Sequence, residues 1–179
     1  MKTTEILIAG FGGQGVLFAG KVLAYAGLIA DKNVSWLPSY GPEMRGGTAN
    51  CSVIVSDNQV GSPIVSKPDV LIAMNLPSYL KYESEVKAGG IIVYDGTLIN
   101  AEQKRSDITY FNVPATKLTE DRGYQTLQNM IILGKVLKET SVLPMEAIEK
   151  AVNKVVPPKK AWLIEKNVEA IKIGLEETL

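Results

Sequence analysis

The stretch Gly10-Phe11-Gly12-Gly13-Gln14-Gly15 follows the apolar run Ile6–Ala9 and precedes a helical pattern from Val16 to Ile29. This order predicts a strand, a tight glycine turn and a helix. Glycines at 10, 12 and 15 have the G-x-G-x-x-G spacing, which lets a backbone approach a pyrophosphate and a helix pack closely on a strand. The N-terminus of the helix would offer unpaired N–H groups and its positive dipole end to an anion. Because close packing alone also requires such glycines, the motif leaves ligand binding and pure packing both open.

The segment after this helix lacks the acidic residue expected of an NAD site. Asn33–Leu37 is predicted to form a second strand, which completes a βαβ unit with a right-handed crossover. In dinucleotide-binding units an Asp or Glu about 20 residues after the glycines holds the ribose hydroxyls. Here that region is Val34–Pro38, and Asp31 precedes the strand. The sequence therefore argues against NAD.

The composition predicts one soluble domain. The chain has 179 residues, which is enough to bury roughly 70% of its unfolded surface in a single core. Its 19 basic and 19 acidic residues cancel, which argues against binding to nucleic acid or to an anionic membrane. No signal-peptide pattern precedes the first strand, so we expect a cytoplasmic protein.

The residue types exclude several kinds of chemistry. The chain has one cysteine, Cys51, and no histidine. This excludes an intrachain disulfide, a four-cysteine iron–sulfur or zinc site, and nucleophiles activated by histidine. Cys51 alternates with apolar residues, and we predict that it is a small core residue rather than a nucleophile.

The rest of the pattern predicts a mixed sheet. Residues 38–47 contain two prolines and three glycines, so we expect a shaped loop at the carboxyl end of the second strand, where α/β sheets place ligands and partners. Thr48–Ser56 alternates as a strand, and Val60–Val65 is expected to return beside it as a hairpin inserted into the α/β order. Three further segments read as strands: Asp69–Met74, Ile91–Tyr94 and Ile108–Val113.

Two polar residues follow buried strands. Asn75 and Asp95 are expected at the edge of the sheet that carries the glycine turn, although an Asp before Gly more often caps its own turn. Helical patterns dominate after residue 114, and the closing helix is expected over Lys160–Glu177. The fold class is therefore α/β: a three-layer α/β/α sandwich, Rossmann-like, with a mixed sheet that contains an inserted β-hairpin, and a helical C-terminal segment.

Two motifs at this spacing resemble those of a known family. Gly10–Val16 reads Gly-Phe-Gly-Gly-Gln-Gly-Val, and Ser39–Gly47 reads Ser-Tyr-Gly-Pro-Glu-Met-Arg-Gly-Gly. Together they resemble the gamma subunit of 2-oxoacid:ferredoxin oxidoreductases. The resemblance continues through Thr48–Val53, Ala73–Asn75 and Tyr94-Asp95, and covers nearly the whole chain. It is strongest to the 2-oxoglutarate type, with the branched-chain 2-oxoisovalerate type close behind.

The resemblance implies a subunit of a larger enzyme. Such an enzyme decarboxylates a 2-oxoacid on thiamine diphosphate, passes electrons through iron–sulfur clusters to ferredoxin, and releases the acyl group as acyl-CoA. Thiamine diphosphate, Mg and the clusters are then expected on alpha, beta and, where present, ferredoxin-like delta subunits. The isolated chain is expected to be inactive and to bind no cofactor tightly.

The resemblance and the residues together predict two contact regions. The first is a phosphate cradle for CoA, made of Gly10, Gly12, Gly13, Gln14, Gly15 and Val16. The second docks against the thiamine-binding subunits through an apolar patch with a charged rim. Its members are Trp36, Leu37, Ser39, Tyr40, Gly41, Pro42, Glu43, Met44 and Arg45. A rigid surface loop with a solvated Glu43–Arg45 pair is the alternative.

Two functions from other classes stay open. If the chain is a stand-alone NAD(P)- or FAD-binding oxidoreductase, the isolated chain is expected to bind nucleotide. If it is a purely structural assembly subunit, it is expected to contact CoA in no state. Within the family, the 2-oxoisovalerate, pyruvate and indolepyruvate enzymes are further alternatives.

Overall fold

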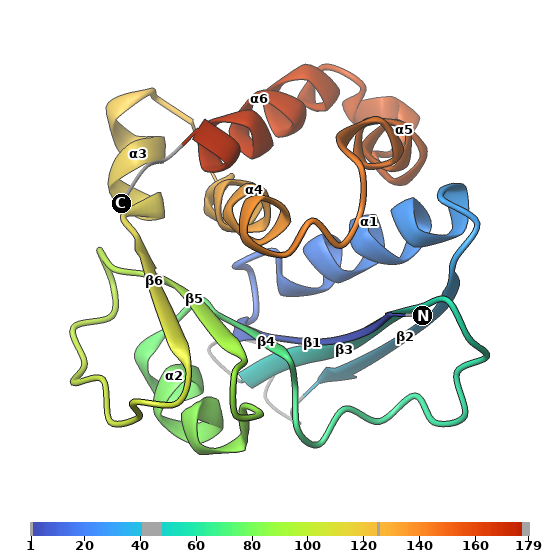
Figure 1. Ribbon diagram of the computed structural model, residues 1–179. Coiled ribbons are helices and arrows are strands. Elements are labelled where there is room, and N and C mark those ends of the chain that lie inside the picture. Colours follow the sequence, from blue (N-terminus) through green and yellow to red (C-terminus); the bar gives the residue numbers. More distant parts are fainter. Residues whose placement is uncertain (1, 41–47, 125, 177–179) are drawn as a thin grey trace.

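The computed structural model describes residues 2–40, 48–124 and 126–176 (Figure 1). A six-stranded sheet has the order β2-β3-β1-β4-β5-β6. The strands are β1 (Thr3–Phe11), β2 (Asn33–Tyr40), β3 (Thr48–Ser56), β4 (Val70–Ala73), β5 (Ile91–Asp95) and β6 (Thr109–Val113). β3 is antiparallel to both of its neighbours, and β1, β4, β5 and β6 run parallel. The predicted mixed sheet is confirmed.

The helices cover the two faces unequally. They are α1 (Val16–Ile29), α2 (Leu76–Tyr82), α3 (Ala115–Asp121), α4 (Gln128–Thr140), α5 (Met145–Val155) and α6 (Leu163–Glu176), with short 3-10 turns η1 (Glu83–Glu85) and η2 (Pro158–Lys160). Figure 1 shows α1 and α4 above one face of the sheet and α2 on the other. α5 contacts α1 and α6 contacts α4, so a second tier of helices lies on the α1 side.

The antiparallel part of the sheet differs from the sequence prediction. Val60–Val65 forms no strand, and β3 pairs with β2 on one side and β1 on the other. Pro63 has no N–H donor and Gly61 has no side chain to pack, so this segment is a poor strand. β1 and β2 are the parallel strands of the predicted βαβ unit, but β3 lies between them. The hairpin partner of β3 is therefore β2.

The second strand is also longer than expected. β2 continues through Pro38 and Ser39 to Tyr40. The sequence pattern predicts a loop for these three residues, and this part of the prediction is wrong. Proline is tolerated there because β2 is an edge strand, with a hydrogen-bonded neighbour on one side only. The expected loop is thereby reduced to residues 41–47, which lie outside the described residues.

Two glycines let α4 and α6 approach closely. A Cβ built on Gly134 would lie 2.0 Å from the carbonyl oxygen of Ile171, and one on Gly174 would lie 1.9 Å from that of Ile131. Real Cβ atoms do not approach so closely, so both positions require glycine at this spacing. The contact fixes the outer helical tier on the inner one.

Candidate functional site

The carboxyl ends of the parallel strands meet at one edge of the sheet. The glycine turn follows β1 there, Asn75 follows β4, and Asp95 ends β5. β2 also ends at this edge, because it runs antiparallel to β3 and so in the direction of β1. The placement of Asn75 and Asp95 beside the glycine turn, predicted from the sequence, is confirmed.

The glycines of the turn serve two different purposes. A Cβ on Gly10 would lie 2.8 Å from the Met74 Cβ and from the Gln14 Oε1, so Gly10 permits close packing. Gly13 and Gly15 have φ angles of 97° and 72°, which disfavour any residue with a side chain. Gly13 is exposed, with no atom within 4 Å of a Cβ built on it. The turn therefore combines a packing glycine with an open, solvent-facing backbone.

Gln14 holds the turn together. Its Oε1 accepts a hydrogen bond from the Phe11 N–H at 2.7 Å, and its Nε2 donates to the Met74 carbonyl at 2.9 Å. Its own N–H donates to the Phe11 carbonyl at 3.2 Å. These hydrogen bonds fix the shape of the turn, so Gln14 supports the predicted cradle, and its contact with a ligand stays a prediction.

The open donors are the backbone N–H groups around Gln14. Within the described part of the chain, the N–H groups of Gly12 and Gly13 make no hydrogen bond. Gly15 precedes α1, no side chain caps this helix, and its first turn contains no acidic residue. The side chain of Val16 is buried in the core, but its N–H is among the first helical donors that lack an intrahelical acceptor. The turn can therefore receive an anion.

Asn75 and Asp95 have structural roles. The Asn75 Oδ1 accepts from the Ser78 N–H at 2.8 Å and so caps α2. The buried Asp95 carboxylate accepts from the Thr97 N–H at 3.1 Å and from the Thr116 hydroxyl at 2.6 Å. The turn-capping alternative for Asp95 is confirmed, and neither residue has a free group to react.

A cavity of about 310 Å³ lies beside the glycine turn, near the lower limit of small-molecule sites. Its walls come from the turn, α1, α4 and the segment from α5 to α6, and its lining residues are Gly13, Gly15, Phe18, Thr126, Leu127, Asn129, Val156, Pro157, Lys160, Leu163 and Asn167. The contribution of α4 and α6 to this cavity was not predicted from the sequence. The available signal was Asn129, a polar residue within an apolar helical stripe.

The predicted interface residues divide between the two faces of β2. The Trp36 side chain, 36% exposed, lies against Gly20 of α1 and interacts with the Cys51 thiol. Leu37, 39% exposed, lines a cavity of about 430 Å³ on the opposite face, together with Ser39 and Tyr82. Strand alternation therefore separates Trp36 from Leu37. The described residues do not include Gly41, Pro42, Glu43, Met44 and Arg45. Docking through this region therefore stays a prediction.

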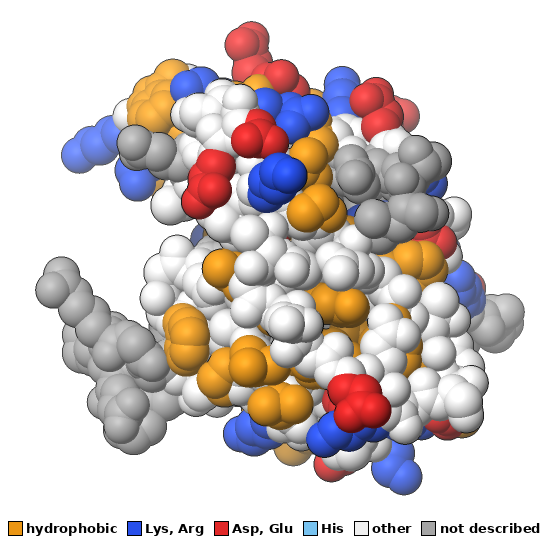
Figure 2. Space-filling view, turned by 90° about the vertical axis from the view of Figure 1, so that its left-hand side faces the viewer, with side chains coloured by type: hydrophobic (Ala, Val, Ile, Leu, Met, Phe, Trp, Pro, Cys, Tyr) orange, Lys and Arg blue, Asp and Glu red, His pale blue; other side chains and the backbone are white. Residues whose placement is uncertain are grey.

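Another apolar surface lies on the side of α2. Leu76 and Leu80 on α2, and Leu98 after β5, are exposed. Figure 2 shows hydrophobic side chains gathered across the lower part of this face, and charged ones concentrated at the top and the bottom. Leu76 and Leu98 follow strand ends, so part of this surface borders the edge that carries the glycine turn.

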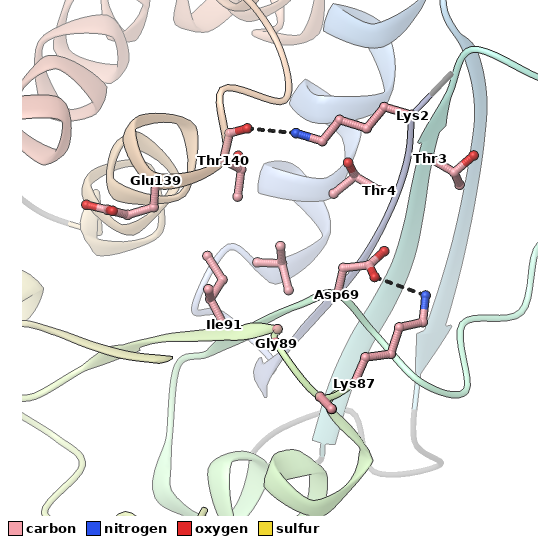
Figure 3. A pocket seen from close by; sticks show the side chains of 12 residues that line it. Lys2, Thr3, Thr4, Asp69, Lys87, Gly89, Ile91, Glu139 and Thr140 are labelled. Atoms are coloured by element: carbon pink, nitrogen blue, oxygen red, sulfur yellow. Dashed lines mark hydrogen bonds and ion pairs between the residues drawn. The ribbon is translucent and has the colours of Figure 1, made fainter. Parts of the chain in front are cut away.

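A further cavity, of about 320 Å³, opens at the opposite edge of the sheet (Figure 3). Lys87 lies 3.0 Å from Asp69 and also pairs with Glu5. Although burial opposes it, these two partners raise the pKa of Lys87. Lys2 donates to the Thr140 carbonyl at 3.1 Å. Because these charged groups satisfy one another, the cavity offers no evident reactive group.

Cys51 is buried and inert, as predicted. It is 0% exposed, and burial raises the pKa of its thiol to about 12. We expect iodoacetamide to leave the folded protein unmodified at pH 8 and to alkylate it fully in guanidinium chloride, because the thiolate is the nucleophile. Mass spectrometry measures both states. Rapid alkylation of the folded chain would contradict this assignment.

The raised pKa of Cys51 also makes the stability of the fold depend on pH. Since the pKa in the folded protein lies above the ordinary 9.0, this thiol contributes stability that is lost as the pH rises from about 9 toward 12.

No group of three or more Cys, Asp or Glu side chains is placed to hold a metal ion within residues 2–40, 48–124 and 126–176. Among the helices of the described chain, none has the length and apolar character required to cross a bilayer.

The sequence matches known proteins over nearly its whole length. Residues 5–177 match the family model described as pyruvate ferredoxin/flavodoxin oxidoreductase. The chain is 37% identical to the 2-oxoglutarate synthase subunit KorC of Methanothermobacter marburgensis, over 96% of this chain and 95% of that protein. It is 38% identical to the ketoisovalerate oxidoreductase subunit VorA of Methanothermobacter thermautotrophicus, over 96% of this chain but 36% of that protein.

Solved structures show the same fold. The gamma subunit of a keto/oxoacid ferredoxin oxidoreductase from Geobacter sulfurreducens superposes with a TM-score of 0.81 at 33% identity, covering 98% of this chain and 96% of that one. The 2-oxoglutarate:ferredoxin oxidoreductase of Magnetococcus marinus, solved with 2-oxoglutarate, coenzyme A and succinyl-CoA bound, gives a TM-score of 0.88 at 22% identity. It covers 98% of this chain and 31% of that one, and its likeness is one of fold.

Proposed function

Because this chain belongs to the pyruvate ferredoxin/flavodoxin oxidoreductase family and is a gamma-type subunit of a 2-oxoacid:ferredoxin oxidoreductase, we propose that its complex acts on 2-oxoglutarate. The complex would convert 2-oxoglutarate and CoA to succinyl-CoA and CO2, and pass two electrons to ferredoxin. The observation that carries the substrate is the similarity to KorC subunits from three archaea, at 34–37% identity over 96% of the chain. The 2-oxoisovalerate enzyme is the nearest alternative, because VorA is equally similar.

The role proposed for this chain is to receive the phosphates of CoA at the glycine turn. The turn fits such a group: the N–H groups of Gly12 and Gly13 are unused, and α1 has neither a side-chain cap nor an acidic first turn. Lys160 lines the adjoining cavity and adds a positive charge. The Magnetococcus relative, of the same fold, was solved with coenzyme A bound. CoA supplies the thiol that accepts the acyl group, and this chain would hold and orient its anionic part.

The other cofactors are proposed to lie on partner subunits. With one buried cysteine and no histidine, this chain lacks the ligands of an iron–sulfur cluster. We therefore place the clusters, thiamine diphosphate and Mg on the alpha, beta and delta subunits. The segment 36–45, which begins within the edge strand β2, is proposed to dock on the thiamine-binding subunits. The complex is proposed to be cytoplasmic, and the balanced charge of this chain argues against binding to nucleic acid or to an anionic membrane.

The proposal is tested by reconstitution. The chain is coexpressed with its partner subunits, and reduction of a viologen is measured with CoA and each of 2-oxoglutarate, 2-oxoisovalerate, pyruvate and indolepyruvate. We expect kcat/KM for 2-oxoglutarate to exceed the others by about tenfold or more, and the reaction to require this chain. A preference for 2-oxoisovalerate would overturn the substrate. If a complex prepared without this chain has an unchanged KM for CoA, this chain is a structural subunit and not part of the CoA site.

The stand-alone alternative makes a separate prediction. An NAD(P)- or FAD-dependent oxidoreductase requires the isolated chain to bind the dinucleotide, which isothermal titration measures directly. We expect no binding, because the region about 20 residues after the glycines, Val34–Pro38, contains no Asp or Glu to hold the ribose hydroxyls. Micromolar binding of NAD by the isolated chain would favour this alternative over the subunit role.

A further inference from the structure

Asn129 lines the cavity beside the glycine turn. It lies at the start of α4 and is 5% exposed. Its Nδ2 donates a hydrogen bond to the Gly15 carbonyl at 3.0 Å. Its Oδ1 is buried and has no hydrogen-bond partner among the described residues. The side chain therefore holds the turn with one end and leaves an acceptor unused at the other.

The orientation of this amide follows from its neighbour. If the oxygen and nitrogen were exchanged, the Asn129 oxygen would face the Gly15 carbonyl oxygen, and two acceptors would repel each other. The amide nitrogen must therefore face Gly15, and the oxygen must be the unpartnered atom. Leaving a buried acceptor without a donor costs free energy, and a ligand that donated a hydrogen bond to it would recover that cost.

The walls of the cavity indicate what kind of ligand group would enter. Phe18, Leu127, Val156 and Leu163 are apolar, while Lys160 adds a positive charge. Gly13 lies at the boundary between the cavity and the open backbone of the turn. A ligand group with a largely apolar body and one N–H or O–H donor, attached to a phosphate, would match the apolar walls, the unpartnered Asn129 oxygen and the neighbouring glycine turn.

We propose that Asn129 is a specificity-determining residue of the ligand site: it accepts a hydrogen bond from a donor on the organic part of the ligand, next to the phosphate that the glycine turn receives. This inference rests on the proposed binding of CoA. In CoA that donor belongs either to the nucleotide end or to the pantetheine arm, and both share the required chemistry. Bare pyrophosphate has no such organic donor and would not use the hydrogen bond to the Asn129 oxygen.

The test compares Asn129→Leu with the unaltered complex. We expect the KM for CoA to rise by about tenfold or more, as loss of a hydrogen bond to a desolvated acceptor implies, with kcat within about twofold. Competitive inhibition constants are then measured for inorganic pyrophosphate, adenosine 3′,5′-bisphosphate and 4′-phosphopantetheine. Pyrophosphate should lose less affinity than the organic probes, because only the lost contact of Asn129 with Gly15 affects it. The organic probe that loses most affinity identifies the end of CoA that Asn129 recognises.

Two further variants separate recognition from support of the turn. Leu163→Trp fills the cavity from α6 without altering the contact with Gly15, and should also raise the KM for CoA. Asn153→Leu, at an exposed asparagine of α5, is the matched control and should change nothing. An unchanged KM for CoA in Asn129→Leu overturns the inference while CoA binding stands. An equal loss for pyrophosphate and the organic probes also overturns it, because Asn129 would then act only by holding the turn. Absence of any CoA dependence would remove the proposed function as well.

Discussion

Replacing Gly134 with alanine is expected to destabilise the fold by about 3 kcal/mol, at the upper end of the range for overpacked cores. The added Cβ would lie 2.0 Å from the Ile171 carbonyl oxygen, and the obstacle is backbone, which cannot rotate away. α4 and α6 must therefore separate, and the apolar contacts between them are lost. Alanine has a higher helix propensity than glycine, by about 1 kcal/mol, so propensity alone would stabilise α4. A measured loss of stability would therefore come from the clash. The measurement is the free energy of unfolding in denaturant, followed by circular dichroism.

The control for this prediction is another glycine. A Cβ on Gly61 meets no atom within 4 Å, and its φ is not positive, so Gly61→Ala should change stability by less than about 1 kcal/mol. Gly174→Ala should match Gly134→Ala, because its Cβ would meet the Ile131 carbonyl at 1.9 Å. The double variant should cost less than the sum, since one separation of the helices relieves both clashes. Wild-type stability in Gly134→Ala would disprove the close crossing.

Replacing Gly13 with aspartate is expected to raise the KM for CoA by about tenfold to a hundredfold in the assembled enzyme, because a carboxylate would occupy the site proposed to receive the phosphates. The substitution is sterically possible, since a Cβ on Gly13 has open space around it. Its φ of 97° adds backbone strain, which is local and does not involve the core. Steady-state kinetics with varied CoA, and recovery of partner subunits in a pull-down, measure the two effects separately.

A matched control accounts for the strain and the charge. Gly89 has a φ of 78° and an equally open surrounding, but it lies at the opposite edge of the sheet. Gly89→Asp should therefore show a similar loss of stability with an unchanged KM for CoA. Unchanged CoA affinity and acyl-CoA formation in Gly13→Asp would remove the phosphate cradle and leave the glycine turn as a packing device.

The site combines local and distant contributions. The glycine turn could be found from the sequence because its spacing and the apolar runs on either side are local patterns. Asn129 is 114 residues from Gly15. No local sequence pattern indicates that it contacts the turn or that its side-chain oxygen has no partner. The hydrogen bond from the Gln14 side chain to the Met74 carbonyl is likewise a tertiary contact, because the pairing of β1 with β4 brings the two residues together.

By itself the sequence determined the strand-turn-helix at Gly10–Gly15, the buried strands, the helical C-terminal part and the core position of Cys51, because each depends on periodicity or turn chemistry within a short segment. Only the tertiary structure decided that β3 inserts between β1 and β2, that Trp36 and Leu37 lie on opposite faces, and that α4 and α6 close a cavity over the glycine turn. These features depend on strand register and helix packing between segments far apart in the chain, whose free energies come from contacts that no local pattern encodes. The glycine turn proposed to receive phosphate was therefore readable in the sequence, while the cavity beside it and the residue proposed to select its ligand were not.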